Sequence, residues 1–172
     1  MINFLDISYL KLGNEKQQKA YQVITDHAVL EKLAQYSPIL VGTIPINIDI
    51  EKSDLDIICH AQDREEFRKK LEHYFRSMKG FIISENQKLH SLKANFFIND
   101  FEFEIFGQNI PTELQNAYCH MLVEHKILQE AGEDFRTRII ELKRQGYKTE
   151  PAFAKLLALK GDAYESLLKL KI

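Results

Sequence analysis

The sequence around residue 50 reads Leu40-Val-Gly-Thr43, then a short spacer, then Ser53-Asp-Leu-Asp-Ile-Ile58. Successive side chains of a strand point to opposite faces, so Asp54 and Asp56 share one face while the apolar residues beside them enter a core. Two carboxylates held this close repel each other unless a cation lies between them or one of them binds a proton. Oxygen ligands on a rigid strand suit magnesium, which usually keeps waters and substrate phosphates as its other ligands. The stretch therefore predicts a magnesium site facing a phosphate.

Each half of this pattern also has a simpler interpretation. An Asp-x-Asp sequence occurs by chance on the solvated face of edge strands, and a Gly-Thr pair can end a strand because glycine adopts positive φ at low cost. The glycine turn and the two aspartates occur here together and in this order. The combination favours a metal site over two unrelated features.

The composition is that of an ordinary single-domain globular protein. The chain has 172 residues, of which 45% are hydrophobic and 28% charged, enough to bury a core. The net charge of −2 and the sequence pI near 6.3 argue against tight, non-specific binding to nucleic acid, which needs a basic face. No apolar run approaches the length of a membrane span and the N-terminus lacks a signal pattern, so we expect a cytoplasmic protein with no membrane partner.

The first part of the chain mixes helical and strand patterns. Asp63 is a typical helix N-cap, Gly80 a typical stop, and Asn99-Asp100 between two β-rich runs is a tight-turn signal. The expected elements are a helix over 15–34, strands over 39–41 and 54–60, a helix over 63–78, a strand over 81–83, and hairpin strands over 89–98 and 101–106. Together they predict a mixed sheet with helices on it.

After Gly107 the patterns are helical only. Pro111 suits the first turn of a helix, and Asp162 is an N-cap for the last one. The expected helices cover 111–128, 133–144, 151–159 and the residues after 162. The fold class is therefore α+β, with an α/β core over 1–108 and a helical part over 109–172 packed on it in one compact unit.

A third carboxylate is expected on the strand over 101–106, where apolar and acidic residues alternate. Glu102 and Glu104 share one face of this strand. If the strand neighbours the one that carries Asp54 and Asp56, a glutamate completes a cluster of three carboxylates. The alternative is a half-buried strand with a polar outer face.

Three further polar residues are candidates for a binding site. His120 and Glu124 lie one helical turn apart, so they can share a ligand or a metal, or line an acceptor pocket; the alternative is an exposed hydrogen-bonded pair. Gln108 follows the strand end, where it can contact a base or ribose or cap the next element.

These motifs resemble those of a known superfamily. Gly42-Thr43 followed by Asp54-Leu-Asp56 resembles the signature of the polymerase-beta-type nucleotidyltransferases. A wider set of motifs is similar to a small bacterial family of nucleotidyltransferase-like proteins of unassigned function: Gly42–Ile50, Ser53–Cys59, Glu104–Gln108 and Gln115–Met121. The resemblance implies a nucleotidyltransferase-like mixed sheet flanked by helices.

The resemblance also implies roles for single residues. Gly42 and Thr43 would hold a nucleoside triphosphate, with Ser53 and Lys52 in the same nucleotide-binding set. Asp54 and Asp56 would bind two Mg²⁺ ions. The third acid of the superfamily lies between hydrophobic residues on a later strand, which favours Glu104, with Glu102 in reserve.

The implied activity is magnesium-dependent transfer of a nucleoside monophosphate from an NTP to an unidentified acceptor. Lys88 or Lys93 of the hairpin would reach the triphosphate, or be a solvated surface charge. The chain departs from the superfamily at Thr43, where serine is commoner, at Glu104, where aspartate is usual, and at Pro45, where many members have a short helix. The alternative is therefore a catalytically inactive module of the same fold that binds a nucleotide or a partner protein.

Overall fold

The computed structural model describes residues 2–170, and within them it contains a five-stranded mixed sheet with the order β1-β2-β5-β4-β3. The strands are β1 (Ile39–Val41), β2 (Leu55–His60), β3 (Lys79–Asn86), β4 (Ser91–Ile98) and β5 (Phe101–Gln108). The pair β2–β5 is parallel and the other three pairs are antiparallel. The mixed sheet, the α+β class and the hairpin turn at Asn99-Asp100 are confirmed.

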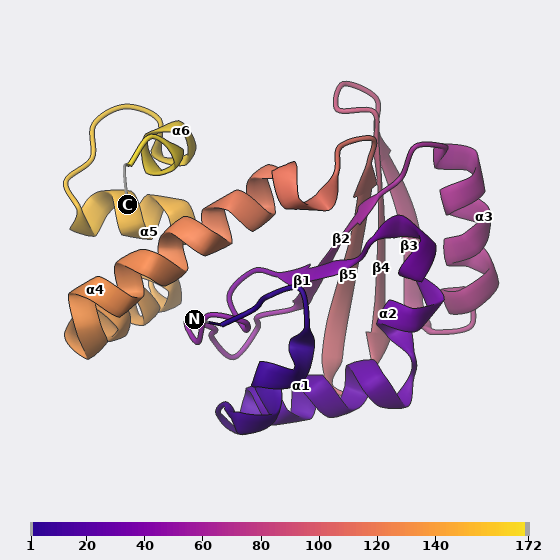
Figure 1. Ribbon diagram of the computed structural model, residues 1–172, viewed down its shortest axis with the longest axis horizontal. Helices are drawn as coiled ribbons and strands as arrows, with labels where there is room; N and C mark the ends of the chain where they lie inside the picture. The colour runs from indigo at the N-terminus through magenta and orange to yellow at the C-terminus, as the bar shows by residue number, and fades with distance from the viewer. Residues whose placement is uncertain (1, 171–172) are drawn as a thin grey trace.

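Helices lie on both sides of this sheet (Figure 1). The α-helices are α1 (Glu15–Asp26), α2 (Val29–Lys32), α3 (Arg64–Phe75), α4 (Asn116–Arg144), α5 (Thr149–Leu156) and α6 (Ala163–Leu168). Three short 3₁₀ helices complete the set: Ile7–Leu12, Ala34–Tyr36 and Thr112–Leu114. No helix within residues 2–170 is long and apolar enough to cross a membrane.

Each face of the sheet carries an apolar layer, although the edge strand β3 is largely exposed. On one face, α1 and α3 pack against alternating residues such as Leu55 and Ile57 of β2 and Phe103 of β5. On the other face, α4 to α6 pack against Val41 and Ile58. Figure 1 shows α3 and the α4–α6 group on opposite sides of the sheet. The two apolar layers leave the sheet rigid, which is what a site built on its strands requires. The division of the chain at residue 108 stays a prediction.

Two helix predictions were wrong in their boundaries. The helix expected over 15–34 ends at Asp26, because Ala28 takes a left-handed conformation (φ 50°) and the chain turns there. This turn lets Val29 and Leu33 enter the core, where neither is exposed. The helix expected over 63–78 ends at Phe75, because residues from 79 onward already pair with β4. Gly80 therefore lies inside a strand.

Two of the C-terminal helices begin at other residues than the sequence predicted: the helix expected from 111 begins at Asn116, after the 3₁₀ helix Thr112–Leu114, and the helix expected from 151 begins at Thr149. The helices expected over 111–128 and 133–144 run together as α4, which is interrupted by the non-helical backbone of Gly132 (φ 81°, ψ −171°). Asp162 caps α6 by accepting a hydrogen bond from the Glu165 N–H (2.9 Å). The end expected for this last helix includes residues 171 and 172, which lie outside the described residues.

Candidate active site

Three carboxylates from two neighbouring strands meet on one face of the sheet. The parallel pairing of β2 and β5 places Asp56 opposite Glu104, and Asp54 directly precedes β2. Carboxylate oxygens of Asp54, Asp56 and Glu104 all lie within 4.8 Å of one another. The condition for a cluster of three carboxylates, that the two strands are neighbours, is met. Glu102, the reserve residue, accepts a hydrogen bond from Asn95 (3.4 Å) and is not part of this group of three.

Burial and mutual repulsion disfavour the charged forms of the aspartates in this carboxylate cluster. Burial, followed by the charges of Asp54 and Glu104, raises the pKa of Asp56 to about 8. Burial also raises the pKa of Asp54. The ammonium group of Lys93 lies 2.8 Å from Glu104, and this hydrogen bond raises the pKa of the lysine. The nearby charges of Lys143 and Lys93 oppose the shift in the pKa of Asp56 only in part, so without a metal Asp56 retains a proton at neutral pH.

Gly42 is required at its position for two separate reasons. Its backbone has φ +85°, a conformation that side chains with a Cβ rarely adopt, and a Cβ built there would lie 2.3 Å from Oδ2 of Asp56. The close approach brings the turn after β1 directly against the carboxylate cluster. The glycine predicted to hold a phosphate is therefore placed beside the predicted metal ligands.

The hydroxyl groups of Thr43 and Ser53 join the two ends of the spacer. The Thr43 hydroxyl donates to Oγ of Ser53 (3.2 Å), and Oγ of Ser53 also accepts the backbone N–H of Ile50 (2.9 Å). Thr43 lines the cleft described below, whereas Lys52 is exposed and does not line it. These two hydrogen bonds indicate that Ser53 stabilises the conformation of the spacer.

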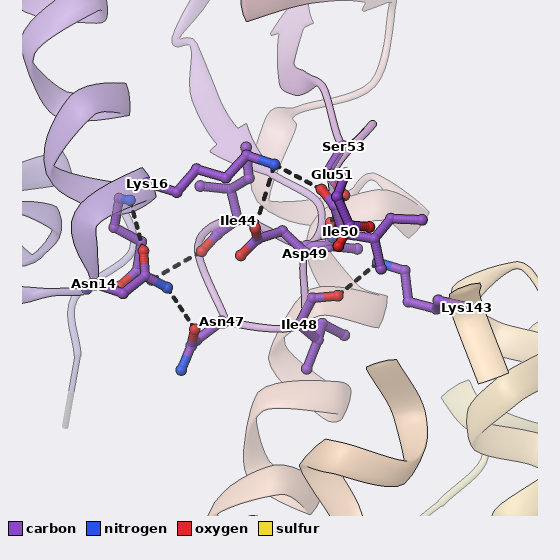
Figure 2. Close-up of polar contacts among 12 residues, drawn as sticks. Asn14, Lys16, Ile44, Asn47, Ile48, Asp49, Ile50, Glu51, Ser53 and Lys143 are labelled. Carbon is purple, nitrogen blue, oxygen red and sulfur yellow. Dashed lines mark hydrogen bonds and ion pairs between the residues drawn. The ribbon is translucent and has the colours of Figure 1, made fainter. Parts of the chain in front are cut away.

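The spacer over 43–53 is held by cationic side chains from two helices. Figure 2 shows Lys16 of α1 and Lys143 of α4 approaching it from opposite sides. The Lys16 ammonium group donates to the Ile50 carbonyl (2.6 Å), and that of Lys143 donates to the Ile48 carbonyl (2.7 Å). Arg136 of α4 donates to two further carbonyls of the spacer, at 2.7 and 3.0 Å. Sequence patterns did not reveal these donors. Their acceptors are backbone carbonyls, which are present at every residue and so do not indicate a partner.

A cleft of about 590 Å³ opens beside the carboxylate cluster. Asp56 and Glu104 line it together with Gly42 and Thr43, so the predicted phosphate-binding turn and two of the predicted metal ligands face one space. Gln108, at the end of β5, lines the same cleft. The cleft is large enough for a nucleotide-sized ligand.

His120 and Glu124 also line the cleft, but not as the exposed pair that was the simpler expectation. Their exposed fractions are 5% and 4%, because α4 packs against α5 and the sheet on this side. Glu150, in the first turn of α5, joins them, and the ligand atoms of the three side chains lie within 4.8 Å of one another. Sequence analysis missed Glu150, because no local pattern connects it to a residue on the preceding helix.

The fold is that of the nucleotidyltransferases. The chain superposes on a Cid1 poly(U) polymerase bound to MgATP with a TM-score of 0.58 at 12% identity, covering 90% of this chain and 49% of that one. For GLD-2 in its complex with RNP-8 the TM-score is 0.58 at 12% identity, covering 96% of this chain and 72% of that one. For a cytoplasmic RNA terminal U-transferase the TM-score is 0.51 at 14% identity, covering 76% of this chain and 39% of that one. This chain thus spans less than half the length of two of the three.

Residues 22–170 match a family described as a domain of unknown function, DUF4269. The match spans most of the chain, and the protein belongs to this family. Among curated proteins, none matches the chain.

Proposed function

We propose that this protein is a magnesium-dependent nucleotidyltransferase that moves a nucleoside monophosphate from an NTP to an acceptor still to be identified. The observation that carries the proposal is the meeting of Asp54, Asp56 and Glu104 within 4.8 Å beside the Gly42 turn. The fold supports it, since the chain superposes on a poly(U) polymerase and an RNA terminal U-transferase. At identities of 12–14% that likeness concerns the fold, so the activity rests on the cluster itself.

The carboxylate cluster fits magnesium by its chemistry. All three ligands are oxygens, which magnesium prefers; Asp56 and Glu104 lie on paired strands, and Asp54 directly precedes β2. Their mutual repulsion and the raised pKa of Asp56 mark a site that a divalent cation would stabilise. One or two Mg²⁺ ions held by Asp54, Asp56 and Glu104 would polarise the α-phosphate and stabilise the pyrophosphate leaving group.

The remaining residues have roles that follow from their positions. Gly42 lets the backbone come close to the cluster, so its N–H and that of Thr43 are suited to contact phosphate oxygens. Glu104 is placed to take the proton of an attacking hydroxyl. Lys93, which pairs with Glu104 at 2.8 Å, is placed to offset phosphate charge. Lys52 is exposed and outside the cleft lining, so we assign it at most an electrostatic role.

Calorimetric titration of ATP, GTP, CTP and UTP with Mg²⁺ tests the proposal. The wild-type protein and the Asp54→Asn/Asp56→Asn variant are compared, with pyrophosphate release measured in the presence of candidate hydroxyl acceptors. Asp134→Asn, an exposed aspartate on α4, is the matched control. We expect metal-dependent nucleotide binding in the wild type and the control, and none in the double variant.

If the folded wild-type protein binds no nucleotide with Mg²⁺, the catalytic proposal is wrong. One observation favours the alternative of a non-catalytic module, because the ammonium group of Lys93 supplies a cation to the cluster without any metal. In that case Lys93→Met should disturb the cluster of the metal-free protein, and the aspartate variants should leave binding of a partner protein unchanged.

A further inference from the structure

We propose that His120, Glu124 and Glu150 form a second metal site, distinct from the carboxylate cluster, that takes a divalent transition metal such as zinc. His120 and Glu124 lie one turn apart on α4, so their side chains project from the same face of the helix. Glu150 comes from the first turn of α5, which packs against α4. One ligand atom of each residue lies within 4.8 Å of those of the other two.

Burial separates this group from ordinary surface carboxylates. His120 is 5% exposed, and its Nδ1 is buried without a hydrogen-bond partner within residues 2–170. Leaving a buried polar atom unpaired is destabilising, so a ligand that pairs with this nitrogen would stabilise the folded chain. A metal ion is a suitable partner for an imidazole that has two carboxylates nearby.

Glu124 places a buried carboxylate close to the His120 imidazole. It is 4% exposed, and burial followed by the nearby charge of Glu150 raises its pKa. Lys143 attracts Glu124 electrostatically, but its ammonium group donates its hydrogen bond to the Ile48 carbonyl (2.7 Å). Glu124 and the partly buried Glu150 lie close together, and a divalent cation between two such carboxylates stabilises both of them.

The ligand set selects a different metal from the one that suits the carboxylate cluster. An imidazole nitrogen with two carboxylate oxygens is a set for zinc and related transition metals, whereas the all-oxygen set of Asp54, Asp56 and Glu104 suits magnesium. Three protein ligands leave the fourth position of a tetrahedral ion open. His120, Glu124 and Glu150 all line the cleft that Asp56 and Glu104 also line, so the two sites border one space. The ring of Tyr164 packs edge-on against His120, with 6.0 Å between ring centroids, and restricts the imidazole orientation.

Zinc titration of the metal-stripped, full-length chain tests this site. The titration uses competition with a chromophoric chelator, in an Asp54→Asn/Asp56→Asn background so that the carboxylate cluster cannot take up the ion. We expect one Zn²⁺ per chain, and we expect His120→Ala to weaken binding by at least about 100-fold, since even outer residues of metal sites contribute 10–100-fold. Co²⁺ should give visible absorption bands that are lost in the same variant.

His73→Ala, which removes an exposed histidine on α3, is the matched control and should bind zinc as the background protein does. Glu150→Gln serves as a second variant, because Glu150 is only partly buried and its replacement leaves the core intact. The proposal would be overturned if the background protein bound no zinc. It would also be overturned if the His120→Ala and Glu150→Gln variants bound zinc as tightly as the background protein does. Because the aspartate background is inactive by design, this outcome is independent of whether the chain transfers nucleotides.

Discussion

Asp56 of β2 lies directly opposite Glu104 of β5 in the single parallel strand pair within residues 2–170. Residues opposite each other in neighbouring strands project from the same face of the sheet. The pairing therefore turns two acidic residues that are distant in sequence into neighbours, and Asp54 joins them from the turn that precedes β2.

Replacing Glu104 with glutamine should reduce nucleotide transfer much more than replacing Glu102 does. Glu104 is one of the three clustered carboxylates, whereas Glu102 accepts a hydrogen bond from Asn95 outside that group. We expect Glu104→Gln to lower magnesium-dependent nucleotide transfer at least about 100-fold, as expected for loss of a metal ligand, and Glu102→Gln to change it little. Pyrophosphate release by the two variants under identical conditions provides the comparison. Equal effects would mean that the choice between the glutamates is wrong.

Gly42→Ala should weaken Mg²⁺ binding as well as lower the stability of the protein. A non-glycine residue at such a φ costs about 1–3 kcal/mol, and the added Cβ would also collide with Asp56. Gly146 has φ +97° but nothing within 4 Å of a Cβ, so Gly146→Ala measures the backbone cost alone. We expect both variants to lose stability in urea unfolding and only Gly42→Ala to lose Mg²⁺ binding. Intact Mg²⁺ binding in Gly42→Ala would show that the close approach is unimportant.

Magnesium affinity should depend on pH through Asp56. The pKa of Asp56 is raised to about 8, so at lower pH a metal ion must displace its proton. We expect the apparent affinity for Mg²⁺ to fall by roughly tenfold per pH unit below 8, with a proton released on binding, and to level off above 8. Calorimetry in buffers of different ionisation enthalpy counts that proton. No proton release at pH 7 would contradict the raised pKa.

The same residue should affect the stability of the metal-free protein. Because the pKa of Asp56 is higher in the folded than in the unfolded chain, its favourable contribution is complete below pH 4 and is lost as the pH rises through about 8. Asp56→Asn removes this dependence. We therefore expect the variant to be more stable than the wild type at pH 9, by more than about 1 kcal/mol, in chelator-treated samples. Parallel pH–stability curves for the two proteins would rule out this role of Asp56.

Replacing Arg136 should destabilise the spacer over 43–53. Its guanidinium group donates to the carbonyls of Ile46 and Asn47 at 2.7 and 3.0 Å. Hydrogen bonds from a charged donor contribute about 1.5–3 kcal/mol each at most, so we expect Arg136→Ala to cost about 1–3 kcal/mol in urea unfolding. Arg138→Ala, two residues along the same helix at an exposed position, should stay within about 0.5 kcal/mol of the wild type. Amide exchange over 44–50 should increase only in the Arg136 variant.

Local sequence signals were sufficient for the strands and turns that carry the cluster. The Asp-x-Asp alternation placed Asp54 and Asp56 on one face, and the Asn99-Asp100 turn set the hairpin that brings Glu104 back along the sheet. The caps at Asp63 and Asp162 were also found from sequence, because an N-cap depends only on residues two or three positions away. These features are local, so composition and spacing are enough to predict them.

Contacts between distant segments were decided only by the tertiary structure. The burial of His120 and Glu124, their meeting with Glu150, and the turn at Ala28 all depend on how helices pack on the sheet. Lys16, Arg136 and Lys143 donate hydrogen bonds to backbone carbonyls of the spacer. Every residue has such a carbonyl, so no sequence pattern indicates which of them accept these bonds. The sequence by itself thus determined which strands carry the carboxylates, through side-chain alternation. Packing decided which cleft they line and which residues surround it, because burial and long-range hydrogen bonds exist only once the chain has folded.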